Sequence, residues 1–298
     1  MKKILPLIFL IIYSPAICFG SAWDVVIKPE TELNKAAFTG NFDQVKQLIN
    51  AGSNVNAKGN VLEKGDDNLT ALMWAVIGNN SEIIQYLINA GADINASEIN
   101  GYTALHISIT DKIPYKAPYS RDFDIVFPNN EKKASTVKLL LSLGADVNAR
   151  TKSMVTTALM HASGGTALMH ASGRGYSDIV KLLIESGADV NIQDNRGYTA
   201  LMSASYKGHR EVAKLLIESG ADVNAQDNDG VTVLMYASKA GLTEVVRLLI
   251  EKGADVDAKD NENWNALRWA LSGRSRESLR SKYLYDDIIE LLRYGDNK

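Results

Sequence analysis

The sequence has little cysteine and histidine, and it contains none of the short motifs that mark common enzymes. The single cysteine is Cys18, so disulfide bonds cannot account for the stability of the folded chain. There are four histidines and no H-E-x-x-H, C-x-x-C, G-x-S-x-G or Walker-type G-K-[ST]. These absences exclude the usual zinc, redox, hydrolase and nucleotide sites. We therefore expect a protein that is not an enzyme and that needs no cofactor and no metal.

Neither sign of charge dominates the chain. Its 298 residues include 32 basic and 35 acidic side chains, and 46% of them are hydrophobic, which is typical of a soluble folded protein. A mildly acidic protein is a poor general partner for nucleic acid or anionic lipid. We expect neither as a ligand.

Long hydrophobic runs are also missing, except at the start. Two lysines precede an apolar run from Ile4 to Tyr13, and small residues follow at Gly20 and Ala22. This order of parts predicts a secretory signal peptide over residues 1–20, cleaved after Gly20 or Ala22. The alternative is an uncleaved N-terminal anchor, although the run is shorter than the ~20 residues of a membrane span. We expect export to the periplasm or outside the cell, with no membrane span in the mature chain.

What the sequence does contain is a repeat. Gly-Ala-Asp followed by Val or Ile and then Asn or Asp recurs five times, at Gly91, Gly144, Gly187, Gly220 and Gly253. The last two intervals are 33 residues each. A second phrase of the type TALM follows most of these turns, and five of the seven methionines fall in it. Self-similarity at this period indicates a stack of equivalent units.

The physical structure of one unit follows from its residues. Thr199 suits a helix N-cap, and Gly208 suits the left-handed residue at the end of that helix. HREVAKLLIES then has apolar residues at helical spacing, and Gly220 ends it. The next ten residues, ADVNAQDNDG, are typical of an extended turn. Each unit is thus helix, turn, helix and hairpin-like turn, with apolar surface that only a neighbouring unit can cover.

These phrases resemble the ankyrin repeat, whose signature is T-P-L-H-x-A in a unit of about 33 residues. The chain has Ala where the family usually has Pro, and only His106 keeps the family histidine. With its N-terminal segment, the chain resembles an exported, bacterial-type ankyrin-repeat protein. The resemblance implies an all-α solenoid of about seven helix-turn-helix units over residues 30–298. The expected units lie near 32–58, 65–97, 98–150, 151–193, 194–226, 227–259 and 260–295.

Two irregularities interrupt the repeat. TALMHASG occurs twice, nine residues apart, within a duplication over 157–173. The second copy is in register with the helix that follows it, so we expect the first copy to be accommodated as a bulge before a helix made by the second. His161 and His170 form a weak metal-ligand pair, because no carboxylate or cysteine pattern accompanies them.

The second irregularity is an insert over residues 111–133, which is rich in proline and aromatic residues. A loop of this length is usually functional or disordered. It can be a second contact for a partner, the carrier of an enzyme or inhibitor activity, or a tolerated surface insertion.

Binding is the function that the resemblance implies. In the family, specificity lies beside the turn tips and at the end of the first helix of each unit. The partner-binding positions expected on that basis are Tyr102, Arg196, Tyr198, Tyr206, Lys207, Asp229 and Trp264. Tyr102, Tyr198 and Trp264 occupy equivalent tip positions and predict a docking row of rings, unless each ring packs on a neighbouring tip instead. We expect a monomer that binds another protein through its concave face; a structural spacer in the cell envelope is the alternative.

Overall fold

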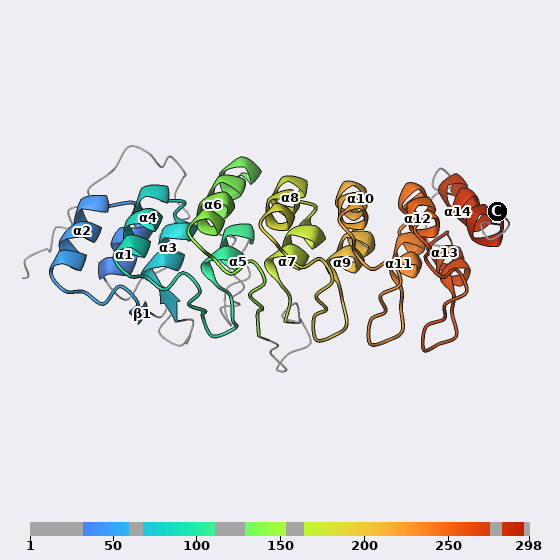
Figure 1. Cartoon of the computed structure of the whole chain (residues 1–298), viewed down its shortest axis with the longest axis horizontal. Helices are drawn as coiled ribbons and strands as arrows, with labels where there is room; N and C mark the ends of the chain where they lie inside the picture. Colours follow the sequence, from blue (N-terminus) through green and yellow to red (C-terminus); the bar gives the residue numbers. More distant parts are fainter. Residues whose placement is uncertain (1–31, 60–67, 111–128, 153–163, 275–281, 295–298) are drawn as a thin grey trace, which may run out of the picture.

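The structure is a computed structural model that describes residues 32–59, 68–110, 129–152, 164–274 and 282–294. The described helices form seven pairs that stand side by side in chain order, from α1 and α2 at one end to α13 and α14 at the other (Figure 1). The expected signal peptide lies outside the described residues. None of the described helices has both the length and the apolar character needed to cross a bilayer.

The first helix of each pair is short and begins after a threonine in all but the first and last pairs. The threonines at these caps are Thr70, Thr103, Thr166, Thr199 and Thr232. The hydroxyls of Thr70, Thr166, Thr199 and Thr232 accept hydrogen bonds from the backbone N–H three residues later, as between Thr199 Oγ1 and Met202 N at 3.2 Å. The Thr103 hydroxyl is instead hydrogen-bonded to His106 Nδ1 at 3.0 Å. These first helices are α1 (Glu32–Thr39), α3 (Ala71–Ile77), α5 (Ala104–Ile109), α7 (Ala167–Arg174), α9 (Ala200–Lys207), α11 (Val233–Lys239) and α13 (Ala266–Arg274).

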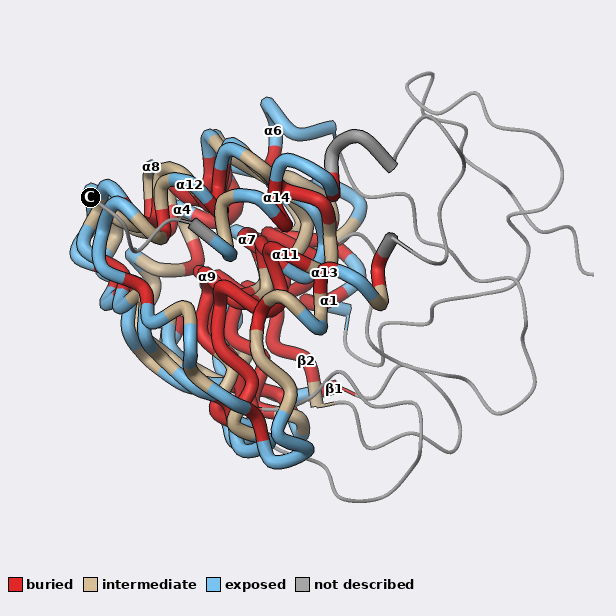
Figure 2. The backbone as a smooth tube through the Cα atoms, turned by 90° about the vertical axis from the view of Figure 1, so that its right-hand side faces the viewer, coloured by how far each residue is buried: buried red, intermediate tan, exposed pale blue. Residues whose placement is uncertain are grey.

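The second helix of each pair is amphipathic and packs its apolar side onto the first helices. In α10, Val212, Ala213 and Leu216 are buried, while Glu211 and Glu218 are exposed. The second helices are α2 (Phe42–Asn50), α4 (Ser81–Asn89), α6 (Asn130–Ser142), α8 (Ser177–Glu185), α10 (Arg210–Glu218), α12 (Thr243–Glu251) and α14 (Lys282–Tyr294). The buried residues form one hydrophobic core. Figure 2 views the array from its end and shows the buried segments gathered towards its middle.

The turn after each second helix joins neighbouring units through an asparagine. The glycine of each Gly-Ala-Asp turn has φ between 85° and 92°, which L side chains rarely adopt. The asparagine two residues after the Asp reaches the next turn: Asn191 Oδ1 accepts from Asp222 N at 2.7 Å, and its Nδ2 donates to Gly220 O at 3.3 Å. We call this repeated contact the asparagine ladder. Its acceptor bonds, all 2.7–2.9 Å long, are made by Asn56, Asn95, Asn148, Asn191 and Asn224.

The hairpins between units show where extra residues enter. A regular hairpin is closed by a bridge between residues six apart, as in Ser97–Thr103 and Gln226–Thr232. At the duplication the same bridge joins Arg150 to Thr166, sixteen residues apart. The second copy of TALMHASG forms α7, as its register predicts, so ten additional residues are taken up within the hairpin. The first copy lies mostly at 157–163, outside the described residues.

The strands β1 (Lys58–Gly59) and β2 (Leu69–Thr70) are the corresponding hairpin near the N-terminus. They pair antiparallel with Lys58 opposite Thr70. These paired residues are twelve apart, against six in a regular hairpin, and α3 still begins directly after Thr70.

The expected insert over 111–133 is shorter than the sequence predicts at its C-terminal end. Residues 130–133 are helical, because α6 begins at Asn130 after the cap Asn129, whose side chain accepts from Lys132 N at 3.2 Å. Lys133 is buried, and its ammonium lies 4.9 Å from the centre of the Tyr176 ring. Residues 111–128 lie outside the described part of the chain.

Candidate protein-binding groove

The hairpins lie on the side of the array that holds the first helices (Figure 1). The candidate site is built from side chains of these first helices and hairpins. One position of the repeat has a different side chain in almost every unit: the fourth residue after the helix cap. It is Trp74, Ile107, His170, Ser203, Tyr236 and Trp269 in successive units. Trp74, Ile107 and Tyr236 are buried, whereas His170, Ser203 and Trp269 are half-buried. This position therefore belongs to the core in some units and reaches the surface in others.

In three units, the hairpin that precedes the first helix contains an aspartate with the same backbone hydrogen bonds. Oδ1 of Asp194 accepts from the backbone N–H of Arg196 at 2.8 Å and of Tyr198 at 2.9 Å. Asp227 and Asp260 make the equivalent pairs of bonds, at 2.8–3.0 Å. The sequence reasoning assigned these aspartates to the turns, and the structure confirms that role for one of their two oxygens.

The second carboxylate oxygen is used differently from unit to unit. Oδ2 of Asp227 accepts from the Tyr236 hydroxyl at 2.6 Å, and Oδ2 of Asp260 accepts from Trp269 Nε1 at 2.8 Å. The hydroxyls of Tyr198 and Tyr236 are also hydrogen-bonded to each other. Because Tyr236 donates to Asp227, the Tyr198 hydroxyl must donate to Tyr236.

The electrostatics of these tyrosines follow from that chain of bonds. Burial raises the pKa of Tyr236 above its usual range, and the hydrogen bond to Asp227 raises it further. Burial also raises the pKa of Tyr198. Both phenols therefore stay protonated at neutral pH and act as hydrogen-bond donors.

Five aromatic rings, including those of Tyr198 and Tyr236, pack against one another in a row along the face of the first helices and hairpins. The centroid of Tyr236 lies 5.4 Å from Tyr198, 5.7 Å from Tyr206 and 5.9 Å from Trp269. Trp269 in turn lies 6.4 Å from Trp264. Most of these contacts are edge-to-face, which is a favourable geometry for aromatic pairs. We call Tyr198, Tyr206, Tyr236, Trp264 and Trp269 the ring row.

Cations cover parts of the ring row. Lys207 Nζ lies 5.3 Å from the centre of Tyr206, Lys239 Nζ lies 4.4 Å from Trp269, and the Arg268 guanidinium lies 4.1 Å from Trp264. These distances are within the range of cation–π attraction. The ring row is thus an aromatic surface with a positive border.

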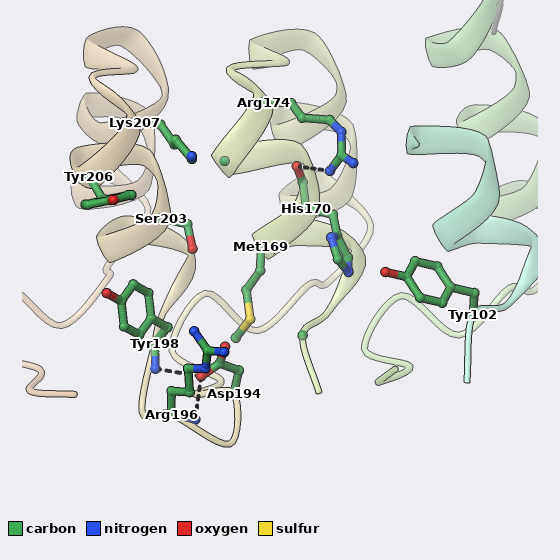
Figure 3. A pocket seen from close by; sticks show the side chains of 12 residues that line it. Tyr102, Met169, His170, Arg174, Asp194, Arg196, Tyr198, Ser203, Tyr206 and Lys207 are labelled. Atoms are coloured by element: carbon green, nitrogen blue, oxygen red, sulfur yellow. Dashed lines mark hydrogen bonds between the residues drawn. The ribbon is translucent and has the colours of Figure 1, made fainter. Parts of the chain in front are cut away.

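A groove of about 540 Å³ lies at one end of the ring row, between α7 and α9 (Figure 3). Its aromatic walls come from Tyr102 and His170 on one side and from Tyr198 and Tyr206 on the other. Charged side chains also line this groove: Arg174, Asp194, Arg196 and Lys207. We call it the α7–α9 groove.

Family models of ankyrin repeats match this chain over most of its length. A model of three copies matches residues 33–114 and 127–227, a model of many copies matches 216–270, and a single-repeat model matches 100–152. The chain belongs to the ankyrin-repeat family. The all-α ankyrin solenoid expected from the sequence is confirmed.

Solved structures show the same fold. The crystal structure of the ankyrin-repeat domain of Bcl-3, described as a unique member of the IkappaB protein family, is 27% identical, with a TM-score of 0.63. That match covers 86% of this chain and 98% of the Bcl-3 domain. The ankyrin-repeat domain of human ASB11 is 21% identical with a TM-score of 0.59, over 83% of this chain and 98% of that domain. No curated protein matches this chain significantly.

The structure brings five of the seven expected binding residues of this ankyrin array to one place. Tyr102, Arg196, Tyr198, Tyr206 and Lys207 all line the α7–α9 groove. Trp264 lies at the far end of the ring row. Asp229 is exposed at a hairpin tip, where its carbonyl accepts from Asn261 N at 2.9 Å.

The tip rings do not form the simple docking row that their equivalent positions suggest. Tyr102 is only 6% exposed, and its ring packs 5.8 Å from His106 and 5.6 Å from His170. Tyr198 packs on Tyr236, and Trp264 packs on Trp269. Tyr102 therefore contributes a wall of the groove, while the exposed aromatic surface comes from Tyr206 and the rings near it.

Sequence reasoning missed Tyr236, Trp269 and Asp194. Tyr236 lies in TVLMYAS, one of the TALM-type phrases of the repeat, and Trp269 lies in the irregular last unit. A usable signal was present, because both stand four residues after the cap position, where a helical turn returns to the same face.

The described residues contain no group of three or more His, Cys, Asp or Glu side chains that could hold a metal ion. His161 lies outside the described part of the chain. His170 instead packs between rings, 5.6 Å from Tyr102 and 5.8 Å from His106.

Proposed function

We propose that this ankyrin-repeat protein binds another protein through the concave face formed by its first helices and hairpins, from α7 to α13. Ankyrin repeats are generally protein–protein interaction modules. The observation that carries the proposal here is the ring row, because Tyr, Trp and Arg are the residues most enriched at binding hot spots. Tyr206 is 52% exposed, which leaves a large ring available to a partner.

The cellular setting we propose is the periplasm or the outside of the cell, reached through a signal peptide over residues 1–20. The support for export is the order of charged, apolar and small residues in that segment. Mass spectrometry of the chain recovered from its native host tests this. A mature N-terminus at Ser21 or Trp23 supports export with cleavage, and an intact Met1 contradicts cleavage.

The binding experiment compares capture of partners by the tagged full-length chain and by a variant of the ring row. The variant is Tyr206→Ala, Lys207→Ala and Trp264→Ala, three changes at the borders of the row. Loss of a hot-spot cluster weakens binding by roughly tenfold or more. A partner bound by the native chain and lost by the variant supports the proposal.

A matched control uses two exposed cations on second helices. Lys181→Ala and Arg247→Ala remove positive charge from α8 and α12 without touching the ring row. The control must capture the partner as well as the native chain does. If the ring-row variant also captures it equally, the concave-face proposal is wrong.

A structural spacer is the second candidate, and the asparagine ladder favours it. Six consecutive turns are joined by five copies of the same contact, so the array can hold two attached objects at a set separation. If the protein is a spacer, the ring-row variant should keep its function in cells, whereas a change in the number of units should abolish it. Deletion of one unit separates the two candidates, because a binding module loses function only if the deleted unit contacts the partner.

We also propose that the chain acts as a monomer. Light scattering of the purified protein checks this, and a mass of twice 32.5 kDa would contradict it.

A further inference from the structure

The α7–α9 groove exists because small residues stand where other units have large ones. Ser203 occupies the position of Tyr236 and Trp269, four residues after the helix cap. Gly165 occupies the tip position of Tyr198 and Trp264, and Gly173 occupies the helix-end position of Tyr206. A Cβ at Gly173 would meet only Ser203 Cβ, at 3.8 Å. The missing side chains leave the groove open.

Because Ser203 replaces the large side chain of other units, one carboxylate oxygen of Asp194 is left as an acceptor in the groove. Asp227 and Asp260 use their second carboxylate oxygen to accept from Tyr236 and Trp269. Asp194 makes the same two backbone bonds through Oδ1, but Ser203 is too short to reach it and instead donates to Thr199 O at 3.0 Å. Within the described part of the chain, Oδ2 of Asp194 accepts no hydrogen bond, and Figure 3 shows this carboxylate at the base of the groove.

The walls fit a ring, and the charges fit an acidic neighbour. Tyr198 and Tyr206 on one side and His170 on the other offer aromatic surfaces to an inserted ring. Arg196 and Lys207 give two positive groups against the single carboxylate of Asp194. This local excess is opposite to the net charge of −3 for the whole chain. A basic ligand would be repelled at this groove, and an acidic one attracted.

We propose that the α7–α9 groove receives a tyrosine or tryptophan side chain from an acidic segment of the protein partner. The inserted ring donates its O–H or N–H to Asp194 Oδ2, as Tyr236 does to Asp227 within the chain. Acidic residues on either side of the ring face Arg196 and Lys207. This inference rests on the proposed function and names the partner chemistry at one part of its surface.

The test selects ligands from a library of randomised linear peptides displayed on phage. The bait is the native chain, and binders of Ser203→Tyr are removed by counter-selection. Ser203→Tyr fills the groove with the residue that the next unit has in this position, so its hydroxyl can pair with Asp194. Peptides with Tyr or Trp next to Asp or Glu are the expected enrichment. Enrichment of basic peptides, of peptides without Tyr or Trp, or of none overturns the inference.

Selected peptides are then measured as synthetic pairs. Replacing the Tyr by Phe keeps the ring but removes the donor, and should weaken binding by roughly tenfold. With Asp194→Asn, whose Oδ1 can still accept the two backbone bonds, that Tyr-to-Phe ratio should fall, because a neutral amide replaces the charged acceptor. An unchanged ratio in Asp194→Asn, or equal binding of both peptides to the native chain, overturns the role of Asp194.

Folding is controlled with two variants at one position. Ser203→Ala keeps the groove open and should bind as the native chain does, while Ser203→Tyr should lose binding at unchanged helicity and melting temperature. Failure of this inference can be told from failure of the proposed function. If Ser203→Tyr still captures the natural partner and the ring-row variant does not, the concave face binds but the groove is not the ring acceptor.

Discussion

Two sets of repeat-equivalent residues behave in opposite ways in this ankyrin array. The asparagines of the ladder keep the same residue and the same contact through five turns. The position four residues after the helix cap holds a different residue in different units. Trp74 belongs to the core, Ser203 lines the groove, and Trp269 is part of the ring row. A position that must make the same bond to the next unit keeps the same residue type. A position on the face of the first helices can hold different residue types in different units. The variable set is therefore where function is to be sought.

The largest effect is expected where the variable position is core. Trp74 is fully buried and packs edge-to-face on Phe38, with ring centroids 5.6 Å apart. Trp74→Ala should lower the free energy of unfolding by about 3–5 kcal/mol, because it leaves a large cavity. Urea denaturation measures this. Ser203→Ala at the equivalent position is the control. An equal loss of unfolding free energy in both variants would contradict the assignment of Trp74 to the core and Ser203 to the groove.

A pH effect is expected from the one unit that has histidine where its neighbours have methionine. Burial lowers the pKa of His106 from 6.5 to about 4, so it is neutral in the folded protein at pH 7. Below pH 6.5 the unfolded chain binds a proton that the folded chain does not, so stability falls as the pH falls towards 4. The loss between pH 7 and pH 5 should be about 2 kcal/mol.

The matched variant for this effect is His106→Met, which installs the residue found at this position in four other units. Urea titrations at pH 7 and pH 5 compare the two proteins. The native chain should lose more stability than His106→Met over this interval. Equal losses would show that His106 does not titrate with a lowered pKa.

A smaller effect is expected at the centre of the ring row. Tyr236→Phe removes the donor to the buried Asp227 carboxylate and should cost about 1–3 kcal/mol. Tyr198→Phe removes a hydroxyl from a half-buried ring and should cost less. Thermal unfolding monitored by circular dichroism ranks the two variants, and the reverse order would contradict the proposed direction of the hydrogen-bond chain.

The ladder itself predicts a modest effect that depends on having a neighbour. Asn224→Ala removes bonds to Asp255 N at 2.8 Å and to Gly253 O at 3.0 Å, and should cost about 1 kcal/mol. The equivalent residue of the last Gly-Ala-Asp turn is Asp257, whose side chain makes no such bond to another turn within the described residues. Asp257→Ala should be close to neutral in the same denaturation experiment. Equal costs would show that the bonds between turns contribute nothing.

The smallest effect is expected from an ion pair on the second helices. Lys214 and Glu244 are hydrogen-bonded, and this bond raises the pKa of Lys214 and lowers that of Glu244. Both groups are exposed to solvent, where such pairs contribute little and are screened by salt. Glu244→Gln should leave the melting temperature unchanged within error, and a clear drop would be unexpected for a contact on this side of the array.

Much of the fold could be predicted from particular residues. Thr199, Gly208 and Gly220 mark the ends of helices, because capping and left-handed backbone depend on local chemistry. The register of the duplicated phrase also gave α7 correctly. The first turn of α6 was missed, since Asn130 and the residues after it resemble a polar loop until the cap Asn129 is recognised.

The candidate site was predicted only in part. Arg196, Tyr198, Tyr206 and Lys207 were expected from family positions, and they do lie together at the α7–α9 groove. That Tyr102 is almost fully buried could not be read from its tip position, because the ring that covers it, His170, is 68 residues away in the sequence. Asp194 was assigned to turn chemistry alone, and its second oxygen became visible only beside Ser203.

By itself, the sequence determined the repeating unit of this protein: its helix caps, its left-handed glycines, its asparagines and the order of its units. These depend on contacts within a few residues, or on a contact repeated identically at each step. The tertiary structure decided which side chains of different units meet, and hence where the ring row runs and where it leaves a groove. Tyr198 and Tyr236, 38 residues apart, touch only because stacking brings one hairpin beside the next helix. Such contacts depend on the exact offset between units, which local chemistry does not specify.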